Sequence, residues 1–264
     1  MIDTCVFSWR HHANFELWRD ALLWTSAVAH AREHFPHVLL VADAPGRALL
    51  HDSLGLPFTE VLALPPGPEG LDHCYGIAKL QAHVIACDRG RPYVHHDHDG
   101  RLERGLPERV QSAPFIAESR YTPLPYASRI NLSLPVMRLP FVTAGLASGI
   151  AGGCHLVGIR AWARESLRVA FAPANREVLR EANGFQASSV LEECAAAHDL
   201  GAGAALIYEH GGNQADAHRT GWYHLAALKN DRGALVQSAL QLQFRFPDAY
   251  AQTMRRWPDC HPHG

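Results

Sequence analysis

The feature that most constrains the fold is a regular alternation of strand-like and helix-like segments over the first hundred residues. Val38–Ala42 is a continuous apolar run of strand length, which is typical of a strand covered on both faces in a largely parallel sheet. Three further segments are predicted strands: Thr4–Ser8, Phe58–Leu64 and Pro92–Asp97. Three stretches between them are predicted helices: Phe15–Phe35, Arg47–Leu54 and Tyr75–Cys87. This order predicts an open α/β sheet built from right-handed crossovers, in which ligands bind at the carboxyl ends of the strands.

The rest of the chain is less regular. Short strands are predicted at Phe115–Glu118, Leu156–Arg160 and Ala204–Tyr208. Helices are predicted at Ala161–Ala170, Asn175–Ala182 and Ser189–His198. The stretch Leu146–Gly153 is glycine-rich, and His210–Thr220 is expected to be a polar loop.

The composition excludes several classes of protein. Of the 264 residues, 47% are hydrophobic and 19% charged, which indicates a globular chain with a core. The formal net charge of −2 gives no basic excess for nucleic acid. Six cysteines without a C-x-x-C spacing suit free thiols in a reducing cytosol. Because Met1–Trp9 lacks the features of a secretory signal and no apolar run is long enough to span a membrane, we expect a cytoplasmic protein.

Two carboxylates, Asp97 and Asp99, stand at the end of the fourth predicted strand and just before Gly100. Residues i and i+2 of a strand point to the same face, so the two carboxylates should point the same way. Two hard oxygen ligands beside a turn suit Mg²⁺ or Mn²⁺, which can keep positions open for a phosphate-bearing substrate. Taken alone, such a D-x-D triplet fits a solvated turn as well.

The neighbouring histidines raise the alternative of a zinc site. His95, His96 and His98 surround the two aspartates. A structural zinc site normally has two paired ligand clusters, usually with cysteine, and Cys74 and Cys87 do not have that spacing. The sequence therefore favours oxygen ligation by the aspartates over a dedicated zinc site.

Lys79-Leu80, followed by Tyr93–Asp99, resembles the nucleotide-sugar-binding half of GT-A-type glycosyltransferases. The chain is most similar to an uncharacterised bacterial family of that fold whose members read Lys-Leu and then Pro-Phe-Leu-His-Ile-Asp-x-Asp. Further pieces of the resemblance are Leu56–Val61, Gly149–Gly153, and Tyr223–Leu225 followed by Lys229. It implies one GT-A-like, Rossmann-like α/β domain over residues 1–264, with a central mixed, mostly parallel sheet flanked by helices. Residues 1–102 would be the nucleotide-sugar-binding half and 103–264 the acceptor-binding half.

The same resemblance assigns roles to particular residues. Asp97 and Asp99 would be the D-x-D and His224 would complete the shell of a Mn²⁺ or Mg²⁺ ion, with Asp97 also able to contact the donor ribose. Gly152 and Gly153 would form a glycine loop near the donor sugar. Glu192 or Glu193 would stand where inverting members carry an acidic base.

Three more residues are candidates for binding the nucleotide sugar. Lys79 could reach the diphosphate or the sugar from the helix before the D-x-D, and Lys229 could reach the diphosphate. Asp43, at the end of a buried strand, could hydrogen-bond the base or ribose, although aspartate also caps helices at such positions. Two departures from the family pattern are His96, where an apolar residue is usual, and Gly100, where relatives continue with an apolar strand.

The predicted function is metal-dependent transfer of a hexosyl or N-acetylhexosaminyl unit from a nucleoside diphosphate, with UDP expected, to an unknown acceptor. The glutamates favour inversion of configuration, whereas His224 with Lys229 favours retention. The alternative is a non-catalytic nucleotide- or metal-binding protein of the same fold. A nucleotidyltransferase is disfavoured because Ser8–His12 lacks the glycine-rich basic loop after the first strand.

Overall fold

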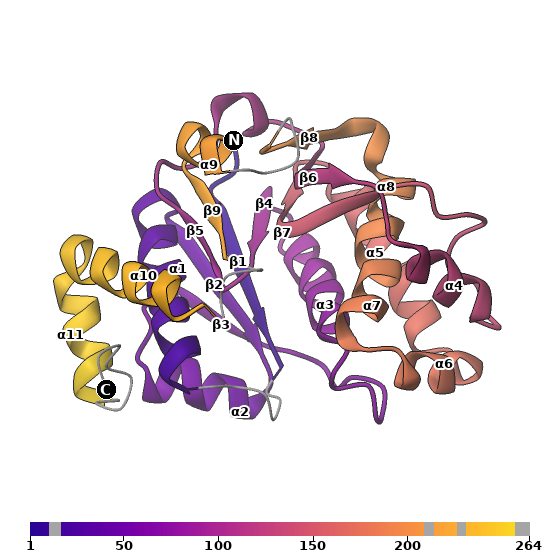
Figure 1. The fold of residues 1–264 in the computed structure, drawn as a ribbon, viewed down its shortest axis with the longest axis horizontal. Helices are drawn as coiled ribbons and strands as arrows, with labels where there is room; N and C mark the ends of the chain where they lie inside the picture. The colour runs from indigo at the N-terminus through magenta and orange to yellow at the C-terminus, as the bar shows by residue number, and fades with distance from the viewer. Residues whose placement is uncertain (11–16, 209–213, 226–230, 257–264) are drawn as a thin grey trace.

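A computed structural model describes residues 1–10, 17–208, 214–225 and 231–256 (Figure 1). Its centre is a seven-stranded sheet in the order β3-β2-β1-β4-β7-β6-β8, flanked by helices (Figure 1). Strands β3, β2, β1 and β4 run parallel to one another, β7 is antiparallel to β4 and β6, and β8 is parallel to β6. The predicted α/β class with a mixed, mostly parallel sheet is confirmed.

The strands of this sheet are β1 Thr4–Trp9, β2 His37–Ala42, β3 Glu60–Ala63, β4 Tyr93–His96, β6 Phe115–Tyr121, β7 Gly145–Gly153 and β8 Ala204–Leu206. A separate antiparallel pair is formed by β5 Gly100–Leu102 and β9 Trp222–His224. The longer helices are α1 Leu17–His34, α3 Tyr75–Asp88, α4 Pro125–Ser133, α5 Leu156–Ala170, α10 Arg232–Arg245 and α11 Pro247–Arg256. The shorter ones are α2 Ala44–Arg47, α6 Arg176–Glu181, α7 Gly184–Ser188, α8 Ala195–Asp199 and α9 Gln214–Thr220, with π-helical turns η1 Ala48–Ser53 and η4 Ser189–Cys194.

Alternate residues of the central strands supply two different cores. On β1, Val6 belongs to the cluster that packs against α3 and α5, whereas the next residue, Phe7, belongs to the cluster that includes Trp24 of α1. This is the two-residue period of a strand buried on both faces, and it explains why Cys5–Phe7 of β1 and Val38–Ala42 of β2 are apolar at consecutive positions.

The first half of the chain follows the prediction, and the second half corrects it at two places. Gly152 and Gly153, expected to form a glycine loop, are the last two residues of the nine-residue strand β7, which joins β4 to β6 inside the sheet. Leu156–Arg160, expected to be a strand, is the first part of helix α5.

The loop prediction was wrong because these glycines allow close packing within the sheet. A Cβ on Gly152 would lie 2.3 Å from the carbonyl oxygen of Tyr93, and the residue has a φ of 152°. These positions let neighbouring backbones approach one another and adopt conformations that side chains disfavour.

The structure also bears on the polar loop predicted at His210–Thr220 and on membrane-spanning helices. Gln214–Thr220 is helix α9, so the polar loop expected there is wrong over these seven residues. Among the described residues, no helix combines the length and the apolar character needed to cross a membrane. The division of the chain at residue 102 stays a prediction, although the pairing of β4 with β7 shows that one sheet continues across it.

Candidate active site

A cavity of about 560 Å³ opens where β1 and β4 end and β7 passes beside them. One wall comes from the end of β1 and from α1. The opposite wall comes from the start of α3, from α7 and from η4. The described residues that line the cavity include Ser8, Arg10, Arg19, Tyr75, Lys79, Asp97, Asp99, Ser148, Gly149, Phe185, Glu192, Glu193 and His224.

Asp97 and Asp99 enter the cavity from a tight turn. The backbone N–H of Gly100 donates to the Asp97 carbonyl over 3.0 Å, and the N–H of Asp97 donates to Gly149 over 2.9 Å. Strand β4 ends at His96, so the turn, and not the strand alternation expected from the sequence, brings the two carboxylates together. Asp99 is almost fully buried, and the Asp97 side chain is about one quarter exposed.

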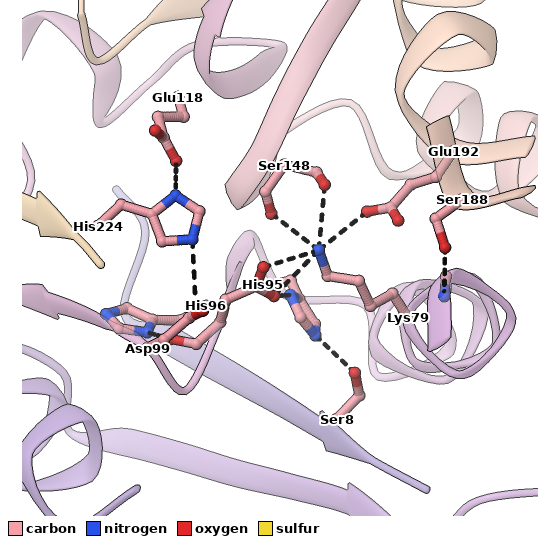
Figure 2. Close-up of polar contacts among 12 residues, drawn as sticks. Ser8, Lys79, His95, His96, Asp99, Glu118, Ser148, Ser188, Glu192 and His224 are labelled. Carbon is pink, nitrogen blue, oxygen red and sulfur yellow. Dashed lines mark hydrogen bonds and ion pairs between the residues drawn. The ribbon is translucent and has the colours of Figure 1, made fainter. Parts of the chain in front are cut away.

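The β5–β9 pair carries His224 to Asp99. Gly100 is directly opposite His224 in this pair, and the N–H of Leu225 donates to the Asp99 carbonyl over 2.9 Å. His224 Nε2 thereby lies 3.3 Å from Asp99 Oδ1 (Figure 2). Gly100 is needed here, since a Cβ at this position would lie 2.3 Å from the ring of Trp222.

Glu118, at the middle of β6, is a site residue that sequence reasoning missed. Its Oε2 lies 2.7 Å from His224 Nδ1, on the side of the ring opposite Asp99 (Figure 2). Burial alone would lower the pKa of His224, but the two carboxylates raise it well above its usual value. A carboxylate that follows the apolar residues Phe115–Ala117 is the same signal that singled out Asp97, and it could have identified Glu118.

An irregularity in β7 creates room for this arrangement. Between the pairs Ala117–Ala151 and Ser119–Ala147, three residues of β7 oppose the single residue Glu118. Such a bulge redirects side chains locally. A Cβ on Gly149, inside the bulge, would lie 2.2 Å from Glu118 Oε2 and 2.5 Å from His224 Nδ1. Gly149 is therefore the glycine that admits the Glu118–His224 pair.

Lys79 lies at the centre of a buried polar cluster (Figure 2). Its Nζ lies 3.0 Å from both carboxylate oxygens of Asp97, 3.0 Å from Ser148 Oγ and 3.2 Å from Glu192 Oε1. Burial alone would lower the pKa of Lys79, but Asp97 and Glu192 raise it, so the side chain is a charged ammonium group. The Lys79 ammonium group thus contacts both Asp97 of the D-x-D and Glu192, one of the two predicted bases.

Glu192 and Glu193 both line the cavity, although adjacent residues of a regular helix would diverge. Glu192 is 1% exposed, and burial raises the pKa of its carboxyl group to about 7. Glu193 accepts a 2.5 Å hydrogen bond from the Tyr121 hydroxyl, and burial raises the pKa of its carboxyl group as well. A pKa of about 7 suits Glu192 as a carboxylate that must exchange a proton near neutral pH.

The three histidines around the D-x-D have separate partners. His95 Nε2 lies 2.8 Å from Ser8 Oγ, and His98 stacks on Trp24 with ring centroids 5.2 Å apart. His96 is buried against Phe7 and Trp222, and burial lowers its pKa to about 3. The neutral imidazole of His96 is therefore part of an aromatic core.

Three predicted residues, Asp43, Gly152 and Gly153, lie away from this cluster. Asp43 caps helix α2 by accepting from the Gly46 N–H over 2.9 Å, and among the described residues it is not part of the cavity lining. Gly152 and Gly153 pair with Val94 and Tyr93, at the end of β4 remote from Asp97, and are likewise absent from the described lining. Lys229 lies outside the described residues. Contact of these four with a nucleotide sugar stays a prediction.

The residues present fit a divalent cation. Asp97, Asp99 and His224 each offer one ligand atom, and these atoms lie within 4.8 Å of one another. Two carboxylate oxygens with one imidazole nitrogen are a donor set that suits Mn²⁺. Glu118 on the far ring nitrogen is the kind of partner that orients a metal-ligating histidine.

Comparison with known proteins gives structural likenesses only. No family model matches the sequence, and no curated protein matches it. Mouse xyloside xylosyltransferase 1, in its apo form, has a TM-score of 0.41 at 10% identity and aligns over 85% of this chain and 97% of its own. PaToxG glycosyltransferase has a TM-score of 0.43 at 9% identity, over 97% of this chain and 84% of its own. Likenesses at this level do not identify a function, so the function must be derived from the residues of the cavity.

Proposed function

We propose that this protein is a metal-dependent glycosyltransferase that takes a sugar from a nucleoside diphosphate, with UDP as the expected nucleotide. The observation that carries the proposal is the meeting of Asp97, Asp99 and His224 at one end of a cavity that also holds Lys79 and Glu192. The two aspartates and His224 suit a cation, and Lys79 suits the phosphates bound to it. Glu192 suits proton transfer. We expect the transferred unit to be a hexose or N-acetylhexosamine and the protein to act in the cytoplasm.

Asp97, Asp99 and His224 would hold Mn²⁺ or Mg²⁺. When bound, such a cation would offset the negative charge that develops on the departing diphosphate. Glu118 keeps His224 oriented for this role through its 2.7 Å contact with Nδ1. Because the apo imidazole is protonated between two carboxylates, cation binding must release its proton.

Two cationic side chains would receive the donor diphosphate. Arg10 lies at the end of β1, where its guanidinium donates to the Pro65 carbonyl and to Gln81 Oε1 over 2.7 and 2.8 Å. These contacts fix the guanidinium at the cavity wall. Lys79 contacts the Asp97 carboxylate and would add positive charge near the donor diphosphate.

The reaction forms a bond between an acceptor oxygen and the anomeric carbon of the donor sugar. The bond from that carbon to the diphosphate oxygen breaks, and its electron pair leaves with the nucleotide. The acceptor's proton passes to the carboxylate of Glu192, whose raised pKa places it close to the working pH. Glu193, fixed by Tyr121, keeps this region polar. Direct displacement of this kind inverts the anomeric configuration.

The experiment is incubation of the protein with a panel of UDP-sugars and Mn²⁺, with release of UDP and of free sugar followed over time. Slow hydrolysis of one donor is expected even without an acceptor, and its loss in Asp99→Asn would tie it to the site. Binding of UDP with no turnover of any donor would instead favour the non-catalytic alternative. The configuration of the first released sugar, read by NMR, tests inversion.

A further inference from the structure

The two walls of the cavity differ in chemistry. The wall from β1 and α1 carries the guanidinium groups of Arg10 and Arg19, and Arg19 is paired with the Asp20 carboxylate over 2.8 and 2.9 Å. The wall from α3, α7 and η4 carries two aromatic rings, Tyr75 and Phe185, beside the carboxyl groups of Glu192 and Glu193. A diphosphate suits the first wall, since arginine pairs well with phosphate oxygens. The second wall is therefore left for another ligand.

The aromatic rings of the second wall are exposed and are held in place. Tyr75 is 44% exposed and Phe185 54%. Phe185 packs against Tyr126 with ring centroids 6.1 Å apart. A Cβ on Gly184 would lie 2.1 Å from the His73 carbonyl oxygen and 3.3 Å from the Tyr75 ring, so the starts of α3 and α7 are in close contact. Fixed aromatic faces that remain open beside a cavity indicate a binding surface.

The carboxyl groups of this wall have protein partners that offset their charge. Glu192 lies 3.2 Å from the Lys79 ammonium, and Glu193 accepts from the Tyr121 hydroxyl. Glu192 is buried and Glu193 is partly buried. A carboxylate already paired with an ammonium group has little need for a cationic ligand, but its remaining lone pairs can still accept hydrogen bonds from hydroxyl groups.

We propose that Tyr75, Phe185, Glu192 and Glu193 form the acceptor site and that the acceptor is a neutral sugar. The C–H face of a pyranose ring would lie on the aromatic rings, and its hydroxyl groups would donate to the two glutamates. One of those hydroxyls would then be the nucleophile next to Glu192. This inference rests on the proposed glycosyl transfer and adds the class of the acceptor to it.

The test is saturation-transfer NMR with simple methyl glycosides of glucose, galactose, mannose and N-acetylglucosamine. UDP and diamagnetic Mg²⁺ are present in excess, and acetylated arginine and lysine amides serve as cationic competitors. Phe185→Ala removes the ring, and Phe185→Trp keeps an aromatic face. Phe171→Ala is the matched control, because Phe171 is 43% exposed and is not among the described residues that line the cavity. The dissociation constant of UDP is measured on every variant.

Ring-proton signals from at least one glycoside are expected with the wild type, Phe171→Ala and Phe185→Trp. Phe185→Ala should weaken that glycoside about tenfold, while UDP affinity stays unchanged. The proposal is overturned if UDP binds but no glycoside gives a signal, if the signals survive Phe185→Ala, or if only the cationic amides bind. Glycoside binding that depends on Phe185 in a protein with no affinity for UDP would uphold the sugar site and refute the nucleotide donor.

Discussion

Substitution of Gly149 by alanine tests how the metal site is built. The new Cβ would lie 2.2 Å from Glu118 Oε2 and 2.5 Å from His224 Nδ1, whereas ordinary contact begins at 3.4 Å. The carboxylate must therefore retreat by about 1.2 Å and the imidazole by about 0.9 Å. Both are side-chain ends that can move, so we expect a folded protein with a stability loss of about 1–3 kcal/mol.

The same displacement should greatly weaken the binding of a cation. Metal–ligand distances tolerate errors of only about 0.2 Å, and loss of the partner that orients a ligating histidine typically weakens binding about 10–100-fold. We therefore expect Gly149→Ala to weaken Mn²⁺ by about that factor, which corresponds to about 1.4–2.7 kcal/mol.

Calorimetric titration of Mn²⁺ into wild type and Gly149→Ala measures this effect, with thermal unfolding as the check on folding. Gly203→Ala is the control, because the nearest atom to its Cβ would be Pro114 Cβ at 3.7 Å. It should bind Mn²⁺ as the wild type does. A folded Gly149→Ala protein with wild-type affinity would refute the assignment of His224 and Glu118 to the cation site.

Three other predictions follow from the same structure. Since the pKa of His224 is raised and Mn²⁺ must displace its proton, Mn²⁺ affinity should increase with pH by up to about tenfold per unit below that pKa; calorimetry in buffers of different ionisation enthalpy should detect the released proton, and equal affinity at pH 6 and 8 would contradict this. If Glu192 is the base, the turnover rate should rise with pH through about 7; Glu192→Gln should remove this limb and most of the rate, and an unchanged profile would exclude Glu192. Gly152→Ala would place a methyl group 2.3 Å from the Tyr93 backbone oxygen, which cannot move aside, so chemical denaturation should show a loss of about 3 kcal/mol or more; wild-type stability would show that the β4–β7 contact can relax.

The sequence predicted the parallel half of the sheet well because its central strands β1 and β2 are rich in apolar residues that are buried on both faces. The sequence also predicted that the carboxylates of Asp97 and Asp99 point the same way. It placed them on one face of a strand, whereas a turn brings them together. His224 was placed by resemblance, and its position depends on pairing between β5 and β9, which are more than a hundred residues apart. Local patterns carry no information about a pairing of that range.

The remaining errors have the same physical origin. Gly152 and Gly153 were expected to form a loop, but they belong to β7, where Gly152 admits the Tyr93 backbone and Gly149 admits the Glu118–His224 pair. Glu118 was missed because its contact with His224 exists only once the β7 bulge and β9 are in place. Asp43 caps helix α2, and its contact with a nucleotide stays a prediction.

The most direct test of the central claim is a calorimetric titration of UDP into the protein with and without Mn²⁺. The wild type should bind UDP tightly only when Mn²⁺ is present. Asp99→Asn, which keeps the side-chain volume, should lose about 100-fold or more of that affinity because it removes a charged ligand of the cation. Asp52→Asn, at an exposed aspartate of η1, should not differ from the wild type. No heat with wild-type protein, or equal UDP affinity in Asp99→Asn, would contradict the account.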